Sequence, residues 1–246
     1  MITPARGIFI TGTDTDAGKT IAAAAVLVSL RAAGIDAVPM KPVQTGAIVQ
    51  GDAPQSPDLE FCLRMAELRP DADELQDMVP FIYEPACSPH LAAAKAGREI
   101  SLDRILEAFL GLLRRHERVI VEGAGGLLAP ITGDKTMIDL MAMLELPVIL
   151  AARPGLGTIN HTLLSIRELE RTGLELLGII FCETSNTGWG EIEENNMETI
   201  VRMGKVPVLG RIPYMPGLAD GMSPQVFRRY SAQLNLPRED EKTPLF

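Results

Sequence analysis

The segment GIFITGTDTDAGKT, residues 7–20, decides the fold. Its first part, Gly7 to Thr11, is a short apolar run typical of a buried strand, and an Ala-rich helical pattern follows from Thr20 to Ala33. Gly34 is placed to end this helix as its C′ residue. A glycine-containing turn between a buried strand and a helix directs backbone N–H groups at an anion, as phosphate-binding loops do.

This loop departs by one residue from the Walker A spacing, in which four residues separate a glycine from Gly-Lys-Ser/Thr. Counting back from Gly18 leads to Thr13, and the nearest upstream glycine is Gly12. The context still predicts nucleotide binding, with Lys19 on the β- and γ-phosphates and the Thr20 hydroxyl on Mg²⁺. The alternative is an ordinary strand-to-helix turn, which the Gly-Lys-Thr triplet before an Ala-rich helix disfavours.

Short apolar runs alternate with helical patterns along the rest of the chain. We expect strands at 36–43, 118–122, 147–152, 176–182 and 206–212, and helices at 101–116, 137–144, 158–172, 191–203 and 224–234. The alternation predicts an α/β fold: a single P-loop NTPase-like domain over residues 1–246, with a mostly parallel sheet and helices on both faces. Ligands of such sheets bind beyond the carboxyl ends of the strands.

Composition excludes several classes of protein. The formal net charge of −9 argues against a nucleic-acid partner held through its phosphates. No apolar run reaches the roughly 18 residues of a membrane span, so no membrane association is expected. Residues 1–8 lack the pattern of a signal peptide. Three distant cysteines, Cys62, Cys87 and Cys182, predict free thiols in the cytoplasm, and with three scattered histidines they do not predict a zinc site.

Three charged residues could extend the phosphate site. Glu122 ends an expected strand and precedes glycines at 123, 125 and 126; it could bind Mg²⁺ beside Thr20, or be a solvated strand end. Periodicity alone makes Asp58 a helix N-cap. Lys41 needs an anionic partner if it is buried, such as a γ-phosphate or a carbamate, unless its head reaches water. Thr45 could add a hydroxyl donor.

Several segments together resemble the dethiobiotin synthetase family. They are GTDTDAGKT (12–20), KPVQTG (41–46), Asp58, SPHLAA (88–93), VEGAGGLLAP (121–130), LPVILAA (146–152) and GTINHTLL (157–164), in the family's order. The lengthened phosphate loop is the family's own form. The combination of KPV, SPH and EGAGG is more specific than the loop, which many P-loop proteins share.

The resemblance implies an ATP- and Mg²⁺-dependent ligase of biotin biosynthesis, which closes a cyclic urea on 7,8-diaminononanoate with CO₂. One amine would take up CO₂ as a carbamate, and the carbamate oxygen would attack the γ-phosphate of ATP. The second amine would then displace phosphate from the mixed anhydride, giving dethiobiotin, ADP and phosphate. The family is a homodimer with its substrate at the subunit interface.

The resemblance also implies residue roles. Lys19 and Lys41 would be catalytic. The nucleotide would contact Asp16, Ala17, Gly18, Lys19, Thr20, Glu122 and Asn186; the substrate would contact Thr15, Lys41, Thr45, Gly125, Thr158, Ile159 and Asn160; and Mg²⁺ would contact Thr20, Asp58 and Glu122. The helix N-terminus at Thr158 would come from the partner subunit and bind a carboxylate, and Thr158 itself could equally be an N-cap.

Some residues receive structural or no roles. Asp16 replaces a Glu that is frequent in the family, and Asn186 lies at an irregular distance from the expected adenine-reading position. We expect His90 to be a structural loop residue, His116 to face solvent and His161 to pack at a dimer interface. Trp189 is assigned no role.

Three other functions fit parts of the pattern. A switch ATPase like the partition and cell-division ATPases would carry a second lysine early in the loop, where Thr13 and Asp14 stand. An amidase of the cobyrinate type would carry an additional glutaminase domain. A catalytically dead homologue would not be expected to keep Lys19, Lys41 and Glu122.

Overall fold

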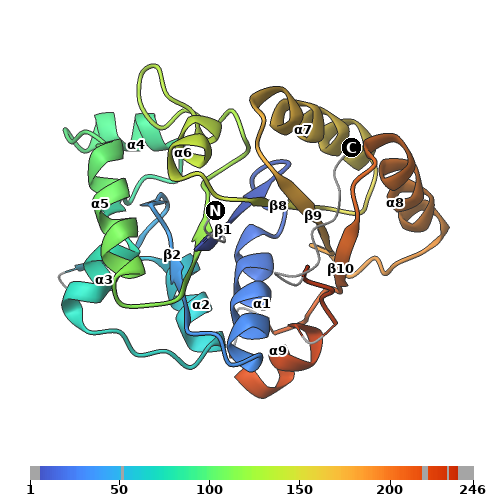
Figure 1. Ribbon diagram of the computed structural model, residues 1–246, viewed down its shortest axis with the longest axis horizontal. Coiled ribbons are helices and arrows are strands. Elements are labelled where there is room, and N and C mark those ends of the chain that lie inside the picture. The colour runs from blue at the N-terminus through green and yellow to red at the C-terminus, as the bar shows by residue number, and fades with distance from the viewer. Residues whose placement is uncertain (1–5, 51–52, 218–220, 232, 238–246) are drawn as a thin grey trace, which may run out of the picture.

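The computed structural model describes residues 6–50, 53–217, 221–231 and 233–237. At its centre is a six-stranded sheet of order β10-β9-β8-β1-β7-β2, in which every neighbouring pair is parallel (Figure 1). Its strands are β1 (Gly7–Gly12), β2 (Ala37–Met40), β7 (Arg118–Glu122), β8 (Val148–Ala152), β9 (Leu176–Cys182) and β10 (Val208–Ile212). The predicted α/β class and mostly parallel sheet are confirmed.

Helices cover both faces of this sheet (Figure 1). One face carries α1 (Lys19–Ala32), α2 (Pro57–Met65) and α9 (Pro224–Ser231). The other carries α3 (Ala72–Met78), α4 (Pro89–Lys95), α5 (Leu102–Leu113), α6 (Met137–Leu144), α7 (Thr158–Thr172) and α8 (Glu191–Gly204). The helix expected at 224–234 ends at Ser231, and residue 232 lies outside the described residues. Within the described part of the chain, no helix is long and apolar enough to cross a membrane.

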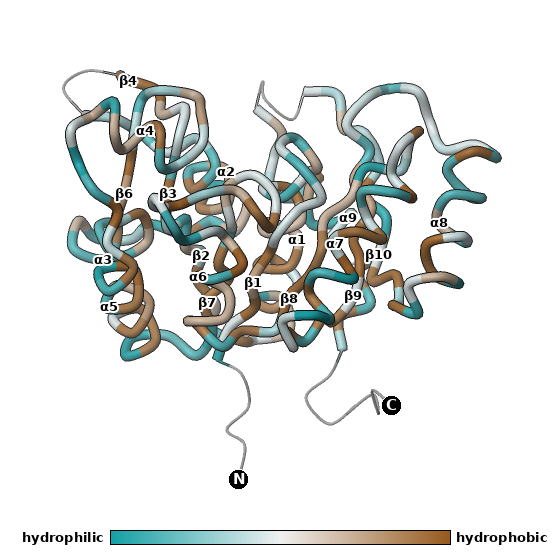
Figure 2. The backbone as a smooth tube through the Cα atoms, turned by 90° about the horizontal axis from the view of Figure 1, so that it is seen from above, coloured by the Kyte–Doolittle hydropathy of each residue, from teal (hydrophilic) through white to brown (hydrophobic). Residues whose placement is uncertain are grey.

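The apolar runs of the strands follow from burial on both sides. In β1, Phe9 belongs to the hydrophobic cluster on the α5 side, and Ile10 belongs to the cluster on the α1 side. The same alternation places Val119 and Val121 of β7 with Phe9, and Ile120 with Ile10. Successive side chains of a strand point to opposite faces, so a sheet covered twice needs apolar residues at both kinds of position. Figure 2 shows hydrophobic residues along β1 and β8.

The strand expected at 36–43 is shorter than predicted. β2 ends at Met40, and the Lys41 N–H donates to the carbonyl of Met78 instead of continuing the ladder. Pro42 has no N–H to donate, so the chain leaves the sheet there. Val43 and Gln44 form β3 (Val43–Gln44), which pairs with β6 (Phe81–Ile82) in a separate sheet, and β4 (Ile48–Gln50) pairs with β5 (Ala53–Gln55). This break turns Lys41 away from the sheet and toward the site described below.

The prediction that His116 faces solvent is wrong. Its ring nitrogens lie 2.8 Å from Oδ2 of Asp36 and 2.6 Å from Oε1 of Glu74, and its side chain is only 18% exposed. Asp36 directly precedes β2, and Glu74 lies in α3. Neither is near His116 in sequence, so helical periodicity did not predict the network.

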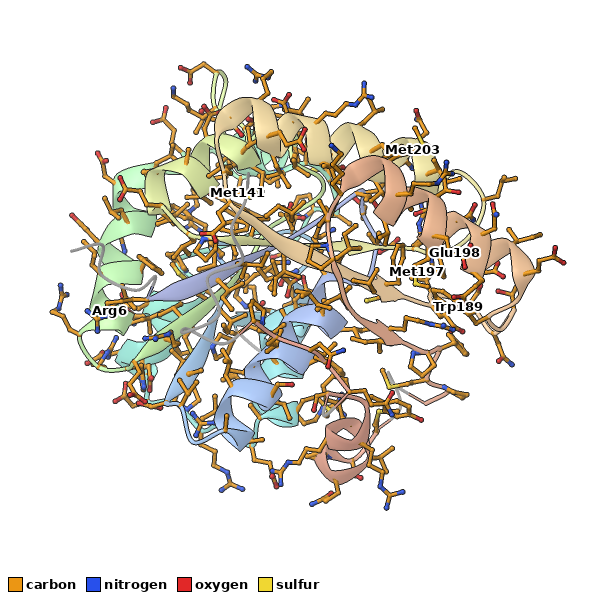
Figure 3. The ribbon with its side chains drawn as sticks, turned by 45° about the vertical axis from the view of Figure 1, so that its right-hand side comes forward. Arg6, Met141, Trp189, Met197, Glu198 and Met203 are labelled. Atoms are coloured by element: carbon orange, nitrogen blue, oxygen red, sulfur yellow. The ribbon has the colours of Figure 1, made fainter. Side chains whose placement is uncertain are left out.

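Trp189 packs at the β10 edge of the sheet, near Met197 of α8 (Figure 3). The guanidinium carbon of Arg211 lies 3.4 Å from the centre of its ring, and its indole N–H donates to Glu194 at 2.6 Å. Phe181 contacts the ring edge-on at a centroid distance of 6.1 Å. The segment that joins β9 to α8 is therefore anchored at its far end by a cation–π and hydrogen-bond cluster.

Candidate active site

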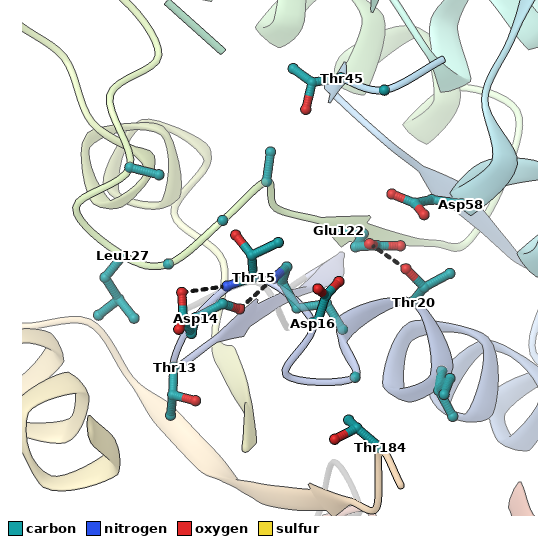
Figure 4. A pocket seen from close by; sticks show the side chains of 18 of the residues that line it. Thr13, Asp14, Thr15, Asp16, Thr20, Thr45, Asp58, Glu122, Leu127 and Thr184 are labelled. Carbon is teal, nitrogen blue, oxygen red and sulfur yellow. Dashed lines mark hydrogen bonds between the residues drawn. The ribbon is translucent and has the colours of Figure 1, made fainter. Parts of the chain in front are cut away.

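A large cleft lies at the carboxyl ends of the central strands (Figure 4). Its volume is about 1210 Å³, and its lining includes the loop after β1, Lys41 after β2, Glu122 at the end of β7 and Glu183 after β9. This is the edge at which parallel α/β sheets bind ligands. Of the predicted site residues, the cleft brings together Thr15, Asp16, Gly18, Lys19, Thr20, Lys41, Thr45, Asp58, Glu122 and Gly125.

The loop after β1 has the backbone of a phosphate-binding turn. Asp16 and Gly18 both have positive φ, at 57° and 90°, and α1 begins at the next residue, Lys19. No side chain caps the N-terminus of α1, so its first N–H groups are available to an anion. Alternation of left- and right-handed residues forms the kind of concave nest in which such groups converge.

Gly18 is required here for two separable reasons. Its φ of 90° strains any other residue, and an added Cβ would lie 2.3 Å from Cβ of Cys182 in β9. Gly34 offers a matched control, because its φ is 86° but an added Cβ would meet nothing within 4 Å.

We therefore expect Gly34→Ala to lower the free energy of unfolding by about 1–2 kcal/mol through strain alone. Gly18→Ala should lower it further and abolish ATP binding, because the loop must move away from β9. Denaturant unfolding and calorimetric titration with ATP measure the two effects. Equal losses of stability with intact ATP binding in both variants would contradict this account.

Lys19 is nearly buried beneath the loop. Its ammonium donates to the carbonyl of Asp14 at 2.7 Å, and the residue is 7% exposed. Burial, followed by repulsion from Lys41, lowers the pKa of Lys19. An anion bound at the loop would offset the free energy spent on burying this charge, as expected of a lysine that binds phosphate.

Lys41, Asp58, Glu122 and Thr20 form one compact cluster at the floor of the cleft. The Lys41 ammonium lies 2.6 Å from Oε1 of Glu122 and 2.7 Å from Oδ2 of Asp58, and it donates to the Gly123 carbonyl at 3.1 Å. The Thr20 hydroxyl donates to the same Oε1 of Glu122 at 2.8 Å (Figure 4). Lys41 and Glu122 are buried, and the Asp58 side chain is 30% exposed toward the cleft. The sequence segments 19–20, 41, 58 and 122 therefore meet at one point.

The charged groups of this cluster shift one another's pKa values. Burial alone would lower the pKa of Lys41, but attraction to Glu122 and Asp58 outweighs it and raises the pKa. Burial opposes ionisation of Asp58 too, yet Lys41 keeps the pKa of that carboxyl below its usual value. Burial raises the pKa of Glu122, and the attraction of Lys41 only partly opposes this shift. The floor of the cleft thus holds a charged lysine between Asp58 and the buried Glu122.

The expectation that Asp58 is a helix N-cap is wrong. Ser56 is the N-cap of α2, and its hydroxyl accepts from the Leu59 N–H at 3.3 Å. Pro57 occupies the first helical position, which suits a residue without an N–H. Asp58 comes next, and its side chain faces Lys41 instead of its own helix end.

The donor set of the cluster suits a hard divalent cation. Asp58 and Glu122 each place an oxygen within hydrogen-bond distance of one nitrogen atom, and the Thr20 hydroxyl is adjacent. The described residues contain no group of three or more His, Cys, Asp or Glu that could enclose a metal. A cation here would draw on two carboxylates and a hydroxyl and complete its shell with phosphate oxygens or water, the coordination that Mg²⁺ favours.

Two glycines after Glu122 lie in the loop that borders the phosphate loop. Gly125 has a φ of 68°, and an added Cβ would lie 2.9 Å from that of Ala129. A Cβ on Gly126 would lie 3.5 Å from the carbonyl of Gly12 in the phosphate loop. The loop after β7 therefore lies against the phosphate loop, and its residues 124–129 line the cleft.

Some predicted site residues lie elsewhere. Ala17 is buried and Asn186 is exposed, and among the described residues neither lines this cleft or the smaller pocket beside it. Thr158 follows the N-cap Gly157, bonds to Thr162 at 3.2 Å and lines the smaller pocket of about 180 Å³. Ile159 and Asn160 line neither cavity as described.

The cleft also has lining that sequence analysis missed. At its β9–β10 end it is bordered by Glu183, Thr184, Tyr214, Met215 and Gly217. All five follow the carboxyl ends of strands β9 and β10, so their positions could have been inferred from topology. Their residue types carried no motif. His90 is exposed and does not contribute to the lining, whereas His161 does.

Comparisons with known proteins show the family to which the chain belongs. The family model of an AAA domain matches residues 6–221. The ATP-dependent dethiobiotin synthetase BioD of Anaeromyxobacter dehalogenans (strain 2CP-C) is 42% identical over 214 residues, which cover 87% of this chain and 92% of the relative. The protein of the same name from Halalkalibacterium halodurans is 40% identical over 228 residues, which cover 92% and 91%.

Solved structures of low sequence identity share the fold. The septum site-determining protein MinD complexed with Mg-ADP from Pyrococcus horikoshii OT3 has a TM-score of 0.58 at 16% identity and covers 94% of both chains. The ParA family ATPase from Chlorobium tepidum TLS has a TM-score of 0.56 at 14% identity, covering 94% of this chain and 100% of that one. These likenesses confirm the P-loop NTPase-like architecture, while the closer sequence matches identify the branch. The chain belongs to the ATP-dependent dethiobiotin synthetase family.

Proposed function

We propose that this protein closes the ureido ring of dethiobiotin on 7,8-diaminononanoate, with CO₂ and ATP, in biotin biosynthesis. The observation that carries the proposal is that the phosphate loop and the buried Lys41 open into one cleft, together with the Asp58–Glu122 carboxylate pair. Its volume of about 1210 Å³ accommodates a nucleotide and a small diamine together. The sequence identity that the chain shares with named synthetases supports this assignment.

The reaction requires three bond-forming steps. One amine nitrogen adds to CO₂ and loses a proton, which gives a carbamate. A carbamate oxygen then attacks the γ-phosphorus as the bond to the β-phosphate oxygen breaks, which releases ADP and leaves a carbamic–phosphoric anhydride. The second amine attacks the carbonyl carbon, phosphate leaves with the former carbamate oxygen, and loss of a proton completes the cyclic urea.

Positive groups of the site would surround the phosphoryl group, whose negative charge shifts during these steps. Lys19 and the N–H groups of residues 16–20 would hold the β- and γ-phosphates. Lys41 would face the carbamate and the γ-phosphoryl group, and Thr45 would donate to the diamine or the phosphate. Thr20, Asp58 and Glu122 would hold Mg²⁺, which when bound stabilises charge on the phosphoryl oxygens. Asp16 and Gly125 would border the nucleotide and the diamine.

We place the complete site at the interface of a homodimer. Residues 158–160 at the N-terminus of α7 do not line the large cleft of their own chain, so the helix end that binds the substrate carboxylate would come from a second copy. Leu128 and Leu164 line the same cleft yet are 62% and 59% exposed, and Leu156 beside α7 is fully exposed. An exposed apolar rim of this kind suits a protein partner.

Leu164→Glu is accordingly expected to shift the protein from dimer to monomer and to lower dethiobiotin formation. Leu110→Glu on α5 is the matched control, because Leu110 is 44% exposed and does not line the cleft. Light scattering after size-exclusion chromatography measures the mass. A Leu164→Glu protein that stays dimeric and active would remove α7 from the proposed interface.

The function is tested with purified protein, ATP, Mg²⁺, bicarbonate and 7,8-diaminononanoate, with each component omitted in turn. Mass spectrometry should detect dethiobiotin in the full mixture alone. ATP hydrolysis stimulated by DNA or lipid, without dethiobiotin, would instead favour a switch ATPase of the ParA and MinD kind. The free cysteines, Cys62, Cys87 and Cys182, suit a protein of the reducing cytoplasm, where we place this activity.

A further inference from the structure

The carboxylate pair at the floor of the cleft already has a cation of its own. Asp58 and Glu122 are the proposed carboxylate ligands of a divalent ion, and both bond to the Lys41 ammonium, at 2.7 and 2.6 Å. Lys41 is 4% exposed, so water does little to weaken this attraction. A divalent ion that approaches the pair therefore competes with a built-in charge.

Neighbouring charges also affect the competition between Lys41 and a divalent ion for the two carboxylates. Lys19 also acts on this cluster, since Lys41 repels it while Glu122 and Asp58 attract it. The carboxylates of Asp58 and Glu122 offset the charges of the two ammonium groups, and Asp16 adds a further negative charge that attracts Lys19. A bare divalent cation would leave this buried region strongly positive, whereas a cation that arrives with a triphosphate brings its own negative charge.

We infer that Lys41 makes metal binding depend on nucleotide: its ammonium excludes free divalent cations from Asp58 and Glu122 until phosphates arrive as an alternative partner. This inference rests on the metal ligands of the proposed function. It gives Lys41 a positioning role before the reaction, beyond its place beside the carbamate. The same exchange would turn the lysine from the carboxylates to the phosphates at the moment when the metal takes its place.

The shared oxygen supports this exchange. Oε1 of Glu122 accepts from both Thr20 and Lys41, at 2.8 and 2.6 Å. A metal bound by Thr20 and by this oxygen of Glu122 would displace the hydrogen bond between the two side chains. Its entry therefore weakens the bond from Glu122 to Lys41, and once Asp58 also turns to the metal the ammonium keeps the Gly123 carbonyl at 3.1 Å.

Lys41→Met tests the inference directly. Binding of Mn²⁺ without nucleotide is followed by electron paramagnetic resonance, which detects the ion irrespective of turnover. The wild-type protein should bind Mn²⁺ weakly, and Lys41→Met should bind it roughly tenfold or more tightly, because two carboxylates then lack a counter-ion. Lys41→Arg keeps the charge and should bind as weakly as the wild type. Lys95→Met, at the exposed end of α4, controls for the loss of a distant lysine charge.

Thermal melting gives an independent readout if Lys41→Met folds poorly without metal. Added Mn²⁺ should raise its melting temperature more than that of the wild type, and the added substitution Glu122→Gln should remove this gain. Equal Mn²⁺ affinity in the wild type and Lys41→Met would overturn the inference. Wild-type protein that binds Mn²⁺ neither alone nor with ATP would instead refute the metal site of the proposed function.

Discussion

Lys41→Gln is expected to lower dethiobiotin formation at saturating substrates by roughly 100- to 1,000-fold, the usual cost of removing a preorganised charge from a reaction centre. Lys41 is the buried cation at the floor of the cleft that is not part of the phosphate loop, and it lies beside the proposed metal ligands. Gln keeps a hydrogen-bond donor but loses the charge that would stabilise the carbamate and the transferred phosphoryl group. Product formation is measured by mass spectrometry under single-turnover conditions.

The control for this variant must separate chemistry from folding. Removing Lys41 leaves Glu122 and Asp58 without a partner, and breaking a buried pair in this way costs about 3–5 kcal/mol. Assays are therefore run at saturating Mg²⁺, with unfolding and ATP binding measured in the same buffer. A Lys41→Gln protein that is folded, binds ATP and turns over at the wild-type rate would show that Lys41 has no part in the reaction.

Lys19→Met should have the second large effect, on the binding of ATP and not on the rate at saturating substrates. We expect the affinity for ATP and the kcat/KM for ATP to fall by on the order of 100-fold or more, since a nearly buried cation for the phosphates is lost. The nucleotide-free variant should be at least as stable as the wild type. Burial and repulsion from Lys41 lower the pKa of Lys19, so its charge costs free energy of folding when no phosphate is bound.

Calorimetric titration with ATP and denaturant unfolding without ATP measure the two parts of this prediction. Lys95→Met is again the matched control and should change neither quantity. Loss of ATP binding together with a large loss of stability would mean that Lys19 holds the loop itself, through its bond to the Asp14 carbonyl.

The fold was predictable because its signals are local. Apolar residues at successive positions of β1 and β7 indicate that both faces of the sheet are buried. The glycine-containing turn directly before the helix at Lys19 indicates a phosphate loop. Pro42 was visible in the sequence, but residues 36–43 were predicted as one strand, because periodicity does not report which sheet a residue joins.

The site was predictable only in part. The membership of Thr20, Asp58 and Glu122 in one group came from a family resemblance, since Asp58 alone looked like a helix cap. The contact of Lys41 with both carboxylates depends on the tertiary structure, and the spacing of these residues in the sequence does not indicate it. Tyr214 and Met215 line the cleft without a motif, because backbone placement after β10 and not residue type brings them there.

The most direct test of the account follows the oxygen atoms of bicarbonate. Purified protein is supplied with bicarbonate labelled with ¹³C and ¹⁸O, together with Mg²⁺, ATP and 7,8-diaminononanoate, and the products are weighed by mass spectrometry. The proposed reaction should place ¹³C in the ureido carbonyl of dethiobiotin and ¹⁸O in the released phosphate, because a carbamate oxygen leaves on phosphorus. Release of unlabelled phosphate without labelled dethiobiotin would contradict it.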